Sequence, residues 1–434
     1  MNVVLARTET GRAMESLFTA SRDRLPGTGK VAETRRLAFE AYEWAGLPHR
    51  RIEEWKYTDL RAMMREVRPL AEKPDAAALK HAKAALKPVA VAGATKLVLV
   101  DGVFAAELSD KAPAGISVTT LRDALEGGAA DLLVTSAVDA MISLNAALAA
   151  DGVVVEVADG TKLAAPLQFI HVATASSVSA FTRSQVKIGK GAHVTLVENF
   201  VAAESAKTYQ AHDAVLLSLG DEAELTQVRL MADSADAVNI TSAIFSVGAK
   251  AKFDLFNMTA GGAISRYQGF VALAGEGSEL NVNGVNLLNG TQHGDTTLVV
   301  DHVVPHCTSR EVFRAVIDDR AHSVFQGRII VRPDAQKTDG KMMTRALLLS
   351  DDAEADNKPE LEIFADDVTC GHGATSGALD ESLLFYLRAR GLPEKDAQAL
   401  LIQAFVGEAI EGIADDDLRE AVMAAAERWL EARA

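Results

Sequence analysis

Residues 189–194 read Gly-Lys-Gly-Ala-His-Val, and the same pattern returns three times along the chain. Each copy is a glycine, then Ala or Ser at the fourth position and an apolar residue at the sixth, and the later copies begin at Gly220, Gly248 and Gly275. The glycines are 31, 28 and 27 residues apart. Strand, glycine turn and strand at such a period are typical of the stacked coils of a β-solenoid. A β-sandwich with glycine in its hairpin turns fits the pattern about equally well.

The region before this repeat, residues 1–150, mixes helices and strands. Residues 96–102 predict a strand and turn, and residues 131–150 predict a helix. An earlier helix is expected to end at residues 46–48, Gly-Leu-Pro. Its apolar stripe would contain Leu37, Ala38, Ala41, Tyr42 and Ala45. Short β-rich runs then continue from residue 151 to residue 365.

Residues 366–434 predict a helical C-terminal domain. Residues 381–390 indicate a short helix that Gly391 ends, Pro393 begins a second helix, and a third helix follows Asp415. The second helix is expected to have an apolar stripe made of Ala397, Leu400, Leu401, Ala404 and Phe405. Helices that follow a solenoid can cover its open end and also dock a partner.

The composition of the 434 residues limits the classes of partner. The formal net charge of −16 repels phosphate backbones and acidic membrane surfaces, so we expect a protein or a cation as partner, and neither nucleic acid nor membrane. No signal-peptide or membrane-length apolar run is present, which predicts a cytoplasmic protein. The two cysteines, Cys307 and Cys370, supply neither a disulfide framework nor a four-cysteine metal site.

The sequence lacks the motifs of a nucleotide-binding or hydrolytic enzyme. Residues 27–30 read Gly-Thr-Gly-Lys but lack the earlier glycine and the following Ser or Thr of a phosphate-binding loop. No G-x-S-x-G motif occurs either. We therefore expect no catalytic residue and no nucleotide bound by this chain.

Two short segments contain metal-ligand residue types. His302 and His306 would lie about 13 Å apart in a strand, and Pro305 prevents a regular helix, so structural or tunnel-lining roles are favoured over a zinc site. In extended backbone, Cys370 and His372 face the same side about 7 Å apart, close enough to share iron or the edge of a cluster. Two ligands do not complete a site, and a buried cysteine with a hydrogen-bonded histidine is the alternative.

Residues 366–380 and 384–391 closely resemble the SufD signature of the SufB/SufD family of iron-sulfur cluster assembly proteins. Three further blocks agree with it, at residues 51–58, 335–339 and 358–363. The related SufB pattern has His-Glu-Ala-Thr where residues 372–375 read His-Gly-Ala-Thr here, and it lacks the preceding cysteine.

This resemblance implies a mainly β fold: a right-handed parallel β-helix over residues 151–365, with the mixed α/β region before it and the helical domain after it. It further implies a non-catalytic scaffold subunit of a SufB, SufC and SufD complex. The β-helix would pair with a SufB-like subunit, and residues 366–434 would dock the SufC ATPase, which supplies the ATPase activity. A homodimer of the isolated chain is a further expectation.

The resemblance also gives Cys370 and His372 a role. They would lie near the SufB interface as cluster-assembly residues and metal ligands shared with SufB, and an iron-sulfur cluster would bind there transiently. A β-helix carbohydrate-active enzyme is a rival interpretation, but an aromatic content of 5% leaves few residues on which sugars can stack. An interaction scaffold outside cluster assembly is the other rival.

Overall fold

The computed structural model describes residues 9–135 and 139–432, and its centre is a parallel β-helix built from two sheets. From residue 153 onward the strands alternate between the sheets, so each of them pairs in parallel with the strand two positions later. The first strands of each sheet, at residues 95–104 and 116–157, form antiparallel pairs instead. The first sheet contains β2 (Val103–Phe104), β1 (Thr95–Val100), β5 (Leu167–Ala173), β7 (His193–Ala202), β9 (Glu224–Ala232), β11 (Lys252–Thr259), β13 (Glu279–Leu288), β15 (Thr308–Ile317), β17 (Asp339–Leu348) and β19 (Thr369–Gly377). The second contains β3 (Ile116–Thr120), β4 (Val153–Val157), β6 (Ser179–Ile188), β8 (Gln210–Leu219), β10 (Val238–Val247), β12 (Ile264–Leu273), β14 (His293–His302), β16 (His322–Val331) and β18 (Glu354–Ile363).

The repeated glycines lie at the corners where the chain passes from the second sheet to the first. A Cβ atom on Gly248 would lie 2.8 Å from the backbone of Gly220 in the preceding coil, and one on Gly275 would lie 1.9 Å from the Ala249 nitrogen. The corner backbones therefore stack too closely for any side chain. This close stacking explains the repeat and confirms the solenoid over the sandwich.

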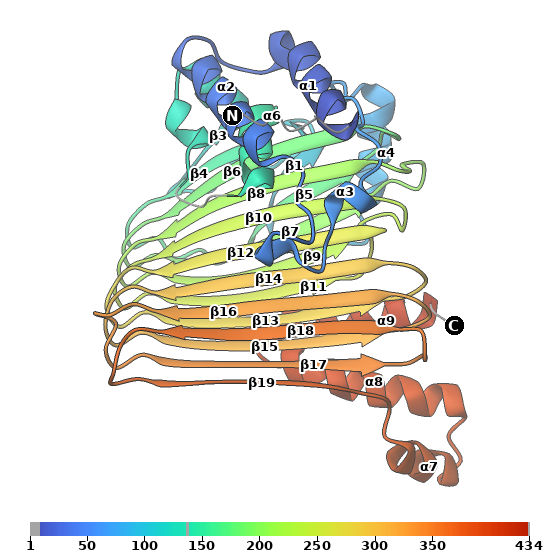
Figure 1. The fold of residues 1–434 in the computed structure, drawn as a ribbon. Helices are drawn as coiled ribbons and strands as arrows, with labels where there is room; N and C mark the ends of the chain where they lie inside the picture. The colour runs from blue at the N-terminus through green and yellow to red at the C-terminus, as the bar shows by residue number, and fades with distance from the viewer. Residues whose placement is uncertain (1–8, 136–138, 433–434) are drawn as a thin grey trace, which may run out of the picture.

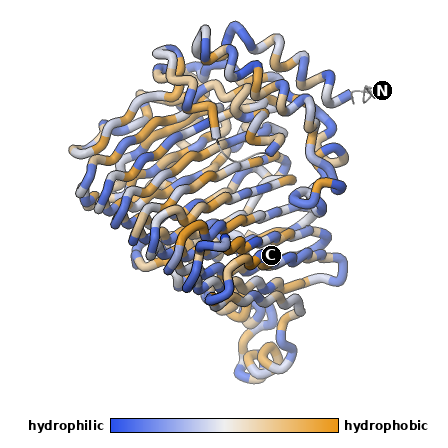
Figure 2. The backbone as a smooth tube through the Cα atoms, turned by 60° about the vertical axis from the view of Figure 1, so that its left-hand side comes forward, coloured by the Kyte–Doolittle hydropathy of each residue, from blue (hydrophilic) through white to orange (hydrophobic). Residues whose placement is uncertain are grey.

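Apolar side chains form a core between the two sheets. Alternate residues of each strand point inward, as the alternating colours in Figure 2 illustrate. Leu255, Leu280 and Val300 are among those that form one continuous core along the β-helix.

The β-strands begin before residue 151, at β1, and continue past residue 365, to the end of β19.

The N-terminal helices cover the outer faces of the first coils (Figure 1). α1 (Glu9–Ser21), α2 (Lys30–Ala45) and α6 (Ala140–Leu148) share a core with Phe181 and Ile240 on the second sheet. α4 (Ala76–Ala85) packs on the first sheet. The shorter helical elements of this region are η1 (Arg22–Arg24), η2 (Glu53–Trp55), α3 (Leu60–Met63), α5 (Leu121–Glu126) and η3 (Ala130–Leu133).

The C-terminal helices are α7 (Glu381–Ala389), α8 (Glu394–Ile410) and α9 (Asp416–Ala432). Gly391, with φ +93°, follows α7, as the sequence predicts. α8 and α9 pack on the outer face of the first sheet, against residues such as Phe256 and Val285. α7 has no buried residue and extends beyond the last coil.

Two predicted helix stripes were partly wrong. α2 buries Val31, Phe39 and Tyr42, whereas Leu37 is 52% exposed. α8 buries a stripe containing Ile402 and Val406. The expected Leu400 and Ala404 face outward. Both helices have apolar residues on more than one side, so their neighbours, α1 and α6 for α2 and the first sheet for α8, decide which side is buried.

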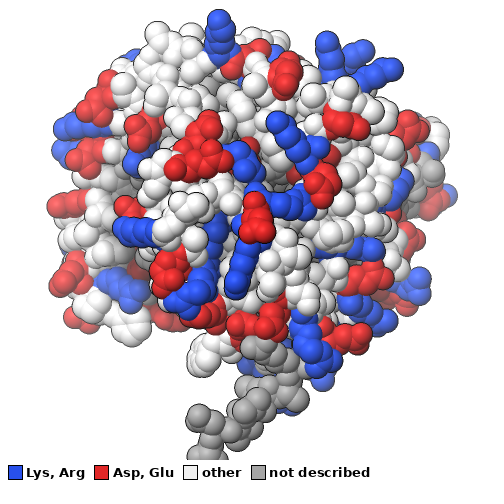
Figure 3. Space-filling model, turned by 90° about the horizontal axis from the view of Figure 1, so that it is seen from above, with Lys and Arg blue, Asp and Glu red and all other residues white. Residues whose placement is uncertain are grey.

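Acidic and basic side chains are interspersed over the face in Figure 3, which looks down on the N-terminal end of the molecule. That view therefore presents no large area of a single charge sign. Within residues 9–135 and 139–432, no helix is long and apolar enough to cross a membrane.

Candidate functional site at the open end of the β-helix

Cys370 and His372 lie in β19, the last strand of the first sheet. Cys370 aligns with Gly340 of β17, and His372 aligns with Met342, whose side chain belongs to the inner core. Because side chains alternate along a strand, both residues face the interior of the β-helix. Cys370 is half-buried against the core, but His372 is exposed because no further coil covers it.

The surroundings of Cys370 favour a neutral thiol. Burial raises the pKa of the Cys370 thiol above its ordinary value, and the negative charges of Asp339 and Glu311 raise it further. A backbone hydrogen bond from Gly340 opposes this shift. Cys370 is therefore no activated nucleophile in the isolated chain, and it needs a metal ion or a nearby positive charge to ionise.

Glu311 is a fully buried carboxyl group inside the same end of the β-helix. It lies in β15, aligned with Met342, so it is in the same row as His372. Burial raises the pKa of Glu311 to about 8, although Ser309 and Arg310 partly offset the effect. Neither carboxyl oxygen has a well-formed hydrogen bond among the described residues. Glu311 belongs to no motif in the sequence, and an acidic residue at an inward position of a strand was the available signal.

His302, His306 and Cys307 lie in different surroundings in the folded protein. His302 is buried in the interior, where its Nε2 lies 3.0 Å from the Ser309 hydroxyl, and burial lowers its pKa to about 4. His306 is exposed at the turn before β15. Cys307 is fully buried and accepts a hydrogen bond from Ser278 at 3.2 Å. The two histidines thus do not share a site, as their spacing predicts.

The sequence blocks at 51–58 and 358–363, distant along the chain, meet at this end of the molecule. Lys358 of β18 donates a hydrogen bond to the Glu53 carboxylate. Arg328 of β16 lies between the two blocks, 3.7 Å from Glu54 and 3.4 Å from Glu360. The N-terminal segment is therefore held against the outer face of the last coils of the second sheet.

Two more of the blocks, 335–339 and 366–380, stack on each other at the corner that precedes β17 and β19. Lys337 forms an ion pair with Asp367. The Gln336 side chain accepts a hydrogen bond from the Asp367 backbone at 2.9 Å. This corner fixes where β19 begins, and so it positions Cys370 and His372.

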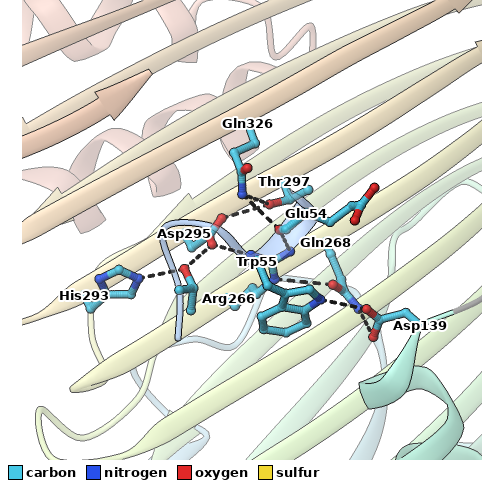
Figure 4. A network of polar contacts seen from close by, with 10 residues as sticks. Glu54, Trp55, Asp139, Arg266, Gln268, His293, Asp295, Thr297 and Gln326 are labelled. Atoms are coloured by element: carbon cyan, nitrogen blue, oxygen red, sulfur yellow. Dashed lines mark hydrogen bonds and ion pairs between the residues drawn. The ribbon is translucent and has the colours of Figure 1, made fainter. Parts of the chain in front are cut away.

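A buried polar network anchors the N-terminal segment (Figure 4). The Arg266 guanidinium lies over the Trp55 ring and forms a buried ion pair with Asp295. Asp295 also accepts a hydrogen bond from Thr58, whose hydroxyl contacts His293. Arg266 and Asp295 pair with each other, so the network orients the N-terminal segment without leaving an unpaired charge in the interior.

Comparison with known proteins identifies the family. A model described as the SufBD core domain of the SUF system for FeS cluster assembly matches residues 171–405, and one for the SufBD N-terminal region matches residues 11–169. The chain belongs to the SufBD family. It is 30% identical to the iron-sulfur cluster assembly protein SufD of Escherichia coli, over 87% of this chain and 88% of that protein. A SufBD family protein of Synechocystis is 31% identical over 85% of this chain and 84% of its own length, and SufD of Bacillus subtilis is 26% identical over 66% of each.

Membership in the SufBD family assigns the protein to iron-sulfur cluster assembly and confirms the resemblance to SufD. Blocks 358–363, 335–339 and 366–380 lie in the last coils, and block 51–58 reaches them through Glu53 as well as contacting β12 through Trp55. The open end of the β-helix is therefore the candidate site.

Proposed function

We propose that this chain is the non-catalytic SufD-type scaffold subunit of a complex with a SufB-like subunit and a SufC-type ATPase. A cluster is built as cargo at the open end of the β-helix, where it is shared transiently with the SufB-like subunit. The observation that carries the proposal is the position of Cys370 and His372 on β19. This strand is at the edge of its sheet and pairs with β17 along one side, so its other side is open to a partner.

β18 and β19 are the terminal strands of the two sheets, and they differ in how well they can pair with a strand of a partner protein. β18 contains Pro359, which has no N–H group, and the charged residues Lys358, Glu360 and Glu362, features that discourage pairing at a sheet edge. β19 reads Thr-Cys-Gly-His-Gly-Ala-Thr-Ser-Gly and has neither proline nor a fixed charge. We infer that the SufB-like subunit pairs along β19, which places its own ligands beside Cys370 and His372. In isolation the same edge would pair two copies of this chain.

Exposed apolar side chains support a second interface at the C-terminal end. Among the described residues with large exposed apolar side chains, four lie on α7 and α8: Leu383, Phe385, Tyr386 and Leu400. Such a cluster marks an interaction surface rather than a solvated helix. We infer that α7 and the adjoining face of α8 dock the SufC-type ATPase.

The chemistry assigned to the site follows from its surroundings. His372 is exposed at the interior mouth, where its imidazole can ligate iron or transfer a proton. Cys370 enters only once iron or a partner's positive charge stabilises its thiolate, because its pKa is raised in the isolated chain. With two ligands from this chain, the remaining ligands come from the SufB-like subunit.

Coexpression with a SufB-like subunit and a SufC-type ATPase tests the proposal. The three chains should copurify as one complex, and the ATPase activity should depend on the SufC-type chain alone. Failure of this chain to join either partner would contradict the proposal.

A further inference from the structure

We propose that His322, Glu354 and Asp356 form a binding site for a divalent first-row transition-metal ion. The inference does not depend on the scaffold function above. The three residues lie on the outer face of the second sheet, where β16 and β18 begin. The site is thus separate from Cys370 and His372, which face the interior from the first sheet.

The backbone register brings the three side chains together. His322 aligns directly with Glu354 across the β16–β18 pair, and Asp356 is two residues further along β18, so it points to the same face. One ligand atom from each side chain lies within 4.8 Å of the other two. The His322 Nε2 is 2.8 Å from an Asp356 oxygen.

These separations suit coordination by one ion. Zinc and similar ions bind imidazole nitrogen and carboxylate oxygen at about 2.0–2.2 Å, so ligand atoms on one ion lie about 3 to 4 Å apart. The side chains need only small rotations to reach that geometry. An imidazole with two carboxylates, and with positions left for water or a fourth ligand, is a donor set for Fe²⁺, Zn²⁺ or Mn²⁺.

The charges of Glu354 and Asp356 also favour binding of a cation. No Lys or Arg forms an ion pair with Glu354 or Asp356 within the described residues, so no fixed positive charge offsets the two carboxylates. The side chains of His322 and Asp356 are 22% and 30% exposed. They are therefore held in place by the sheet and remain accessible to an ion from solution.

Neighbouring residues fix the orientation of the His322 ring. The His293 ring packs edge-on against it, with the centroids 4.8 Å apart. The Nε2 of His293 is 2.9 Å from the Thr58 hydroxyl, which connects it to the buried network of Figure 4. Such outer contacts hold a metal-binding histidine in one orientation and strengthen the site.

Anaerobic titration of the full-length chain with Co²⁺ tests the site, followed by visible absorption and calorimetry. We expect one bound Co²⁺ with a spectrum that lacks a sulfur-to-cobalt band. His322→Ala and Glu354→Gln should each weaken binding at least about tenfold. His193→Ala is the matched control, because His193 lies beside one carboxylate, that of Glu224, at 3.4 Å, and it should bind Co²⁺ like the wild type.

Melting temperatures give a second readout. An ion that joins β16 to β18 should raise the melting temperature of the wild type and of His193→Ala, but not that of Glu354→Gln. Glu354 is exposed, so this variant folds even if His322→Ala does not. The proposal is wrong if no saturable binding occurs, if both site variants bind normally, or if Cys370→Ser abolishes the binding.

Discussion

The Arg266 guanidinium carbon lies 3.7 Å from the centre of the Trp55 ring. Both side chains are fully buried, and the Trp55 indole N–H donates a hydrogen bond to Asp139 at 2.8 Å. Arg266 belongs to β12, and Trp55 to the N-terminal segment. The contact therefore fixes a segment from the beginning of the sequence onto the middle of the β-helix.

Trp55→Ala should destabilise the isolated protein by about 3–5 kcal/mol, because it leaves a cavity and removes the surface that covers Arg266. Trp44→Ala is the matched control. Trp44 is 90% exposed on α2, so its removal should change the free energy of unfolding by less than about 0.5 kcal/mol. Denaturant unfolding of both variants measures the difference, and equal effects would contradict the anchoring role.

Gly275→Ala should destabilise the β-helix by about 1–3 kcal/mol, because the new methyl group would collide with the Ala249 backbone of the preceding coil. Gly377→Ala is the control, since a Cβ atom there meets nothing within 4 Å. Thermal and denaturant unfolding of the two variants test the stacking. A Gly275→Ala protein as stable as the control would show that the corners are not closely stacked.

The glycine repeat left a solenoid and a β-sandwich about equally favoured. The structure explains it by contact between coils, which requires Gly248 and Gly275 at the corners and is local and periodic. The buried stripe of α2 was less predictable. Leu37 is as apolar as Phe39, and only the packing of α2 against α1 and α6 selects Phe39 for burial. Sequence thus indicates that a helix forms more readily than it indicates which face is covered.

The free energy of unfolding of Glu311→Gln should depend less on rising pH than that of the wild type. The pKa of Glu311 is raised to about 8 in the folded protein from an ordinary value of 4.5, so its protonated form favours folding below pH 4.5. That contribution decreases as the pH rises and is lost above the folded pKa. Between pH 5 and 8 the stability of Glu311→Gln should therefore rise relative to wild type by more than about 1 kcal/mol.

Unfolding free energies at pH 5, 6.5 and 8 measure this effect. Glu279→Gln serves as the control, because Glu279 is an exposed residue of β13 paired with Lys252. It should follow the wild type at all three pH values. A pH-independent difference between Glu311→Gln and wild type would show that Glu311 is already ionised inside the β-helix.

Phe385→Ala should reduce capture of the SufC-type ATPase while leaving the melting temperature unchanged. Phe385 is 72% exposed on α7, which has no buried residue, so the change affects docking rather than folding. Removal of all residues after Asp380 is a poorer test, because α8 and α9 also cover the first sheet. Trp44→Ala, on the opposite end, should capture the ATPase normally. Equal capture by Phe385→Ala and wild type would show that Phe385 is not part of the docking surface.

The candidate site was only partly predictable from the sequence. The motif identifies Cys370 and His372, and their shared strand follows from the extended pattern. The pairing of Glu53 with Lys358 joins residues 305 positions apart, which only the folded coils reveal. Glu311 was not foreseen for the same reason, since its burial depends on the coils above and below it.

The central claim is that His372 acts in cluster assembly at the mouth of the β-helix. His372 is exposed, so His372→Ala should change stability by less than about 0.5 kcal/mol and should still copurify with both partners. Cys370→Ser should have a smaller effect on cluster content, because the thiol is largely neutral before metal arrives. His306→Ala, an exposed histidine at a neighbouring corner, is the matched control.

The most direct test measures iron and sulfide in the anaerobically purified complex from cells that depend on this pathway. The complex containing His372→Ala should be intact but hold much less cluster than the wild-type and His306→Ala complexes. A normal cluster content in an intact His372→Ala complex would contradict the claim.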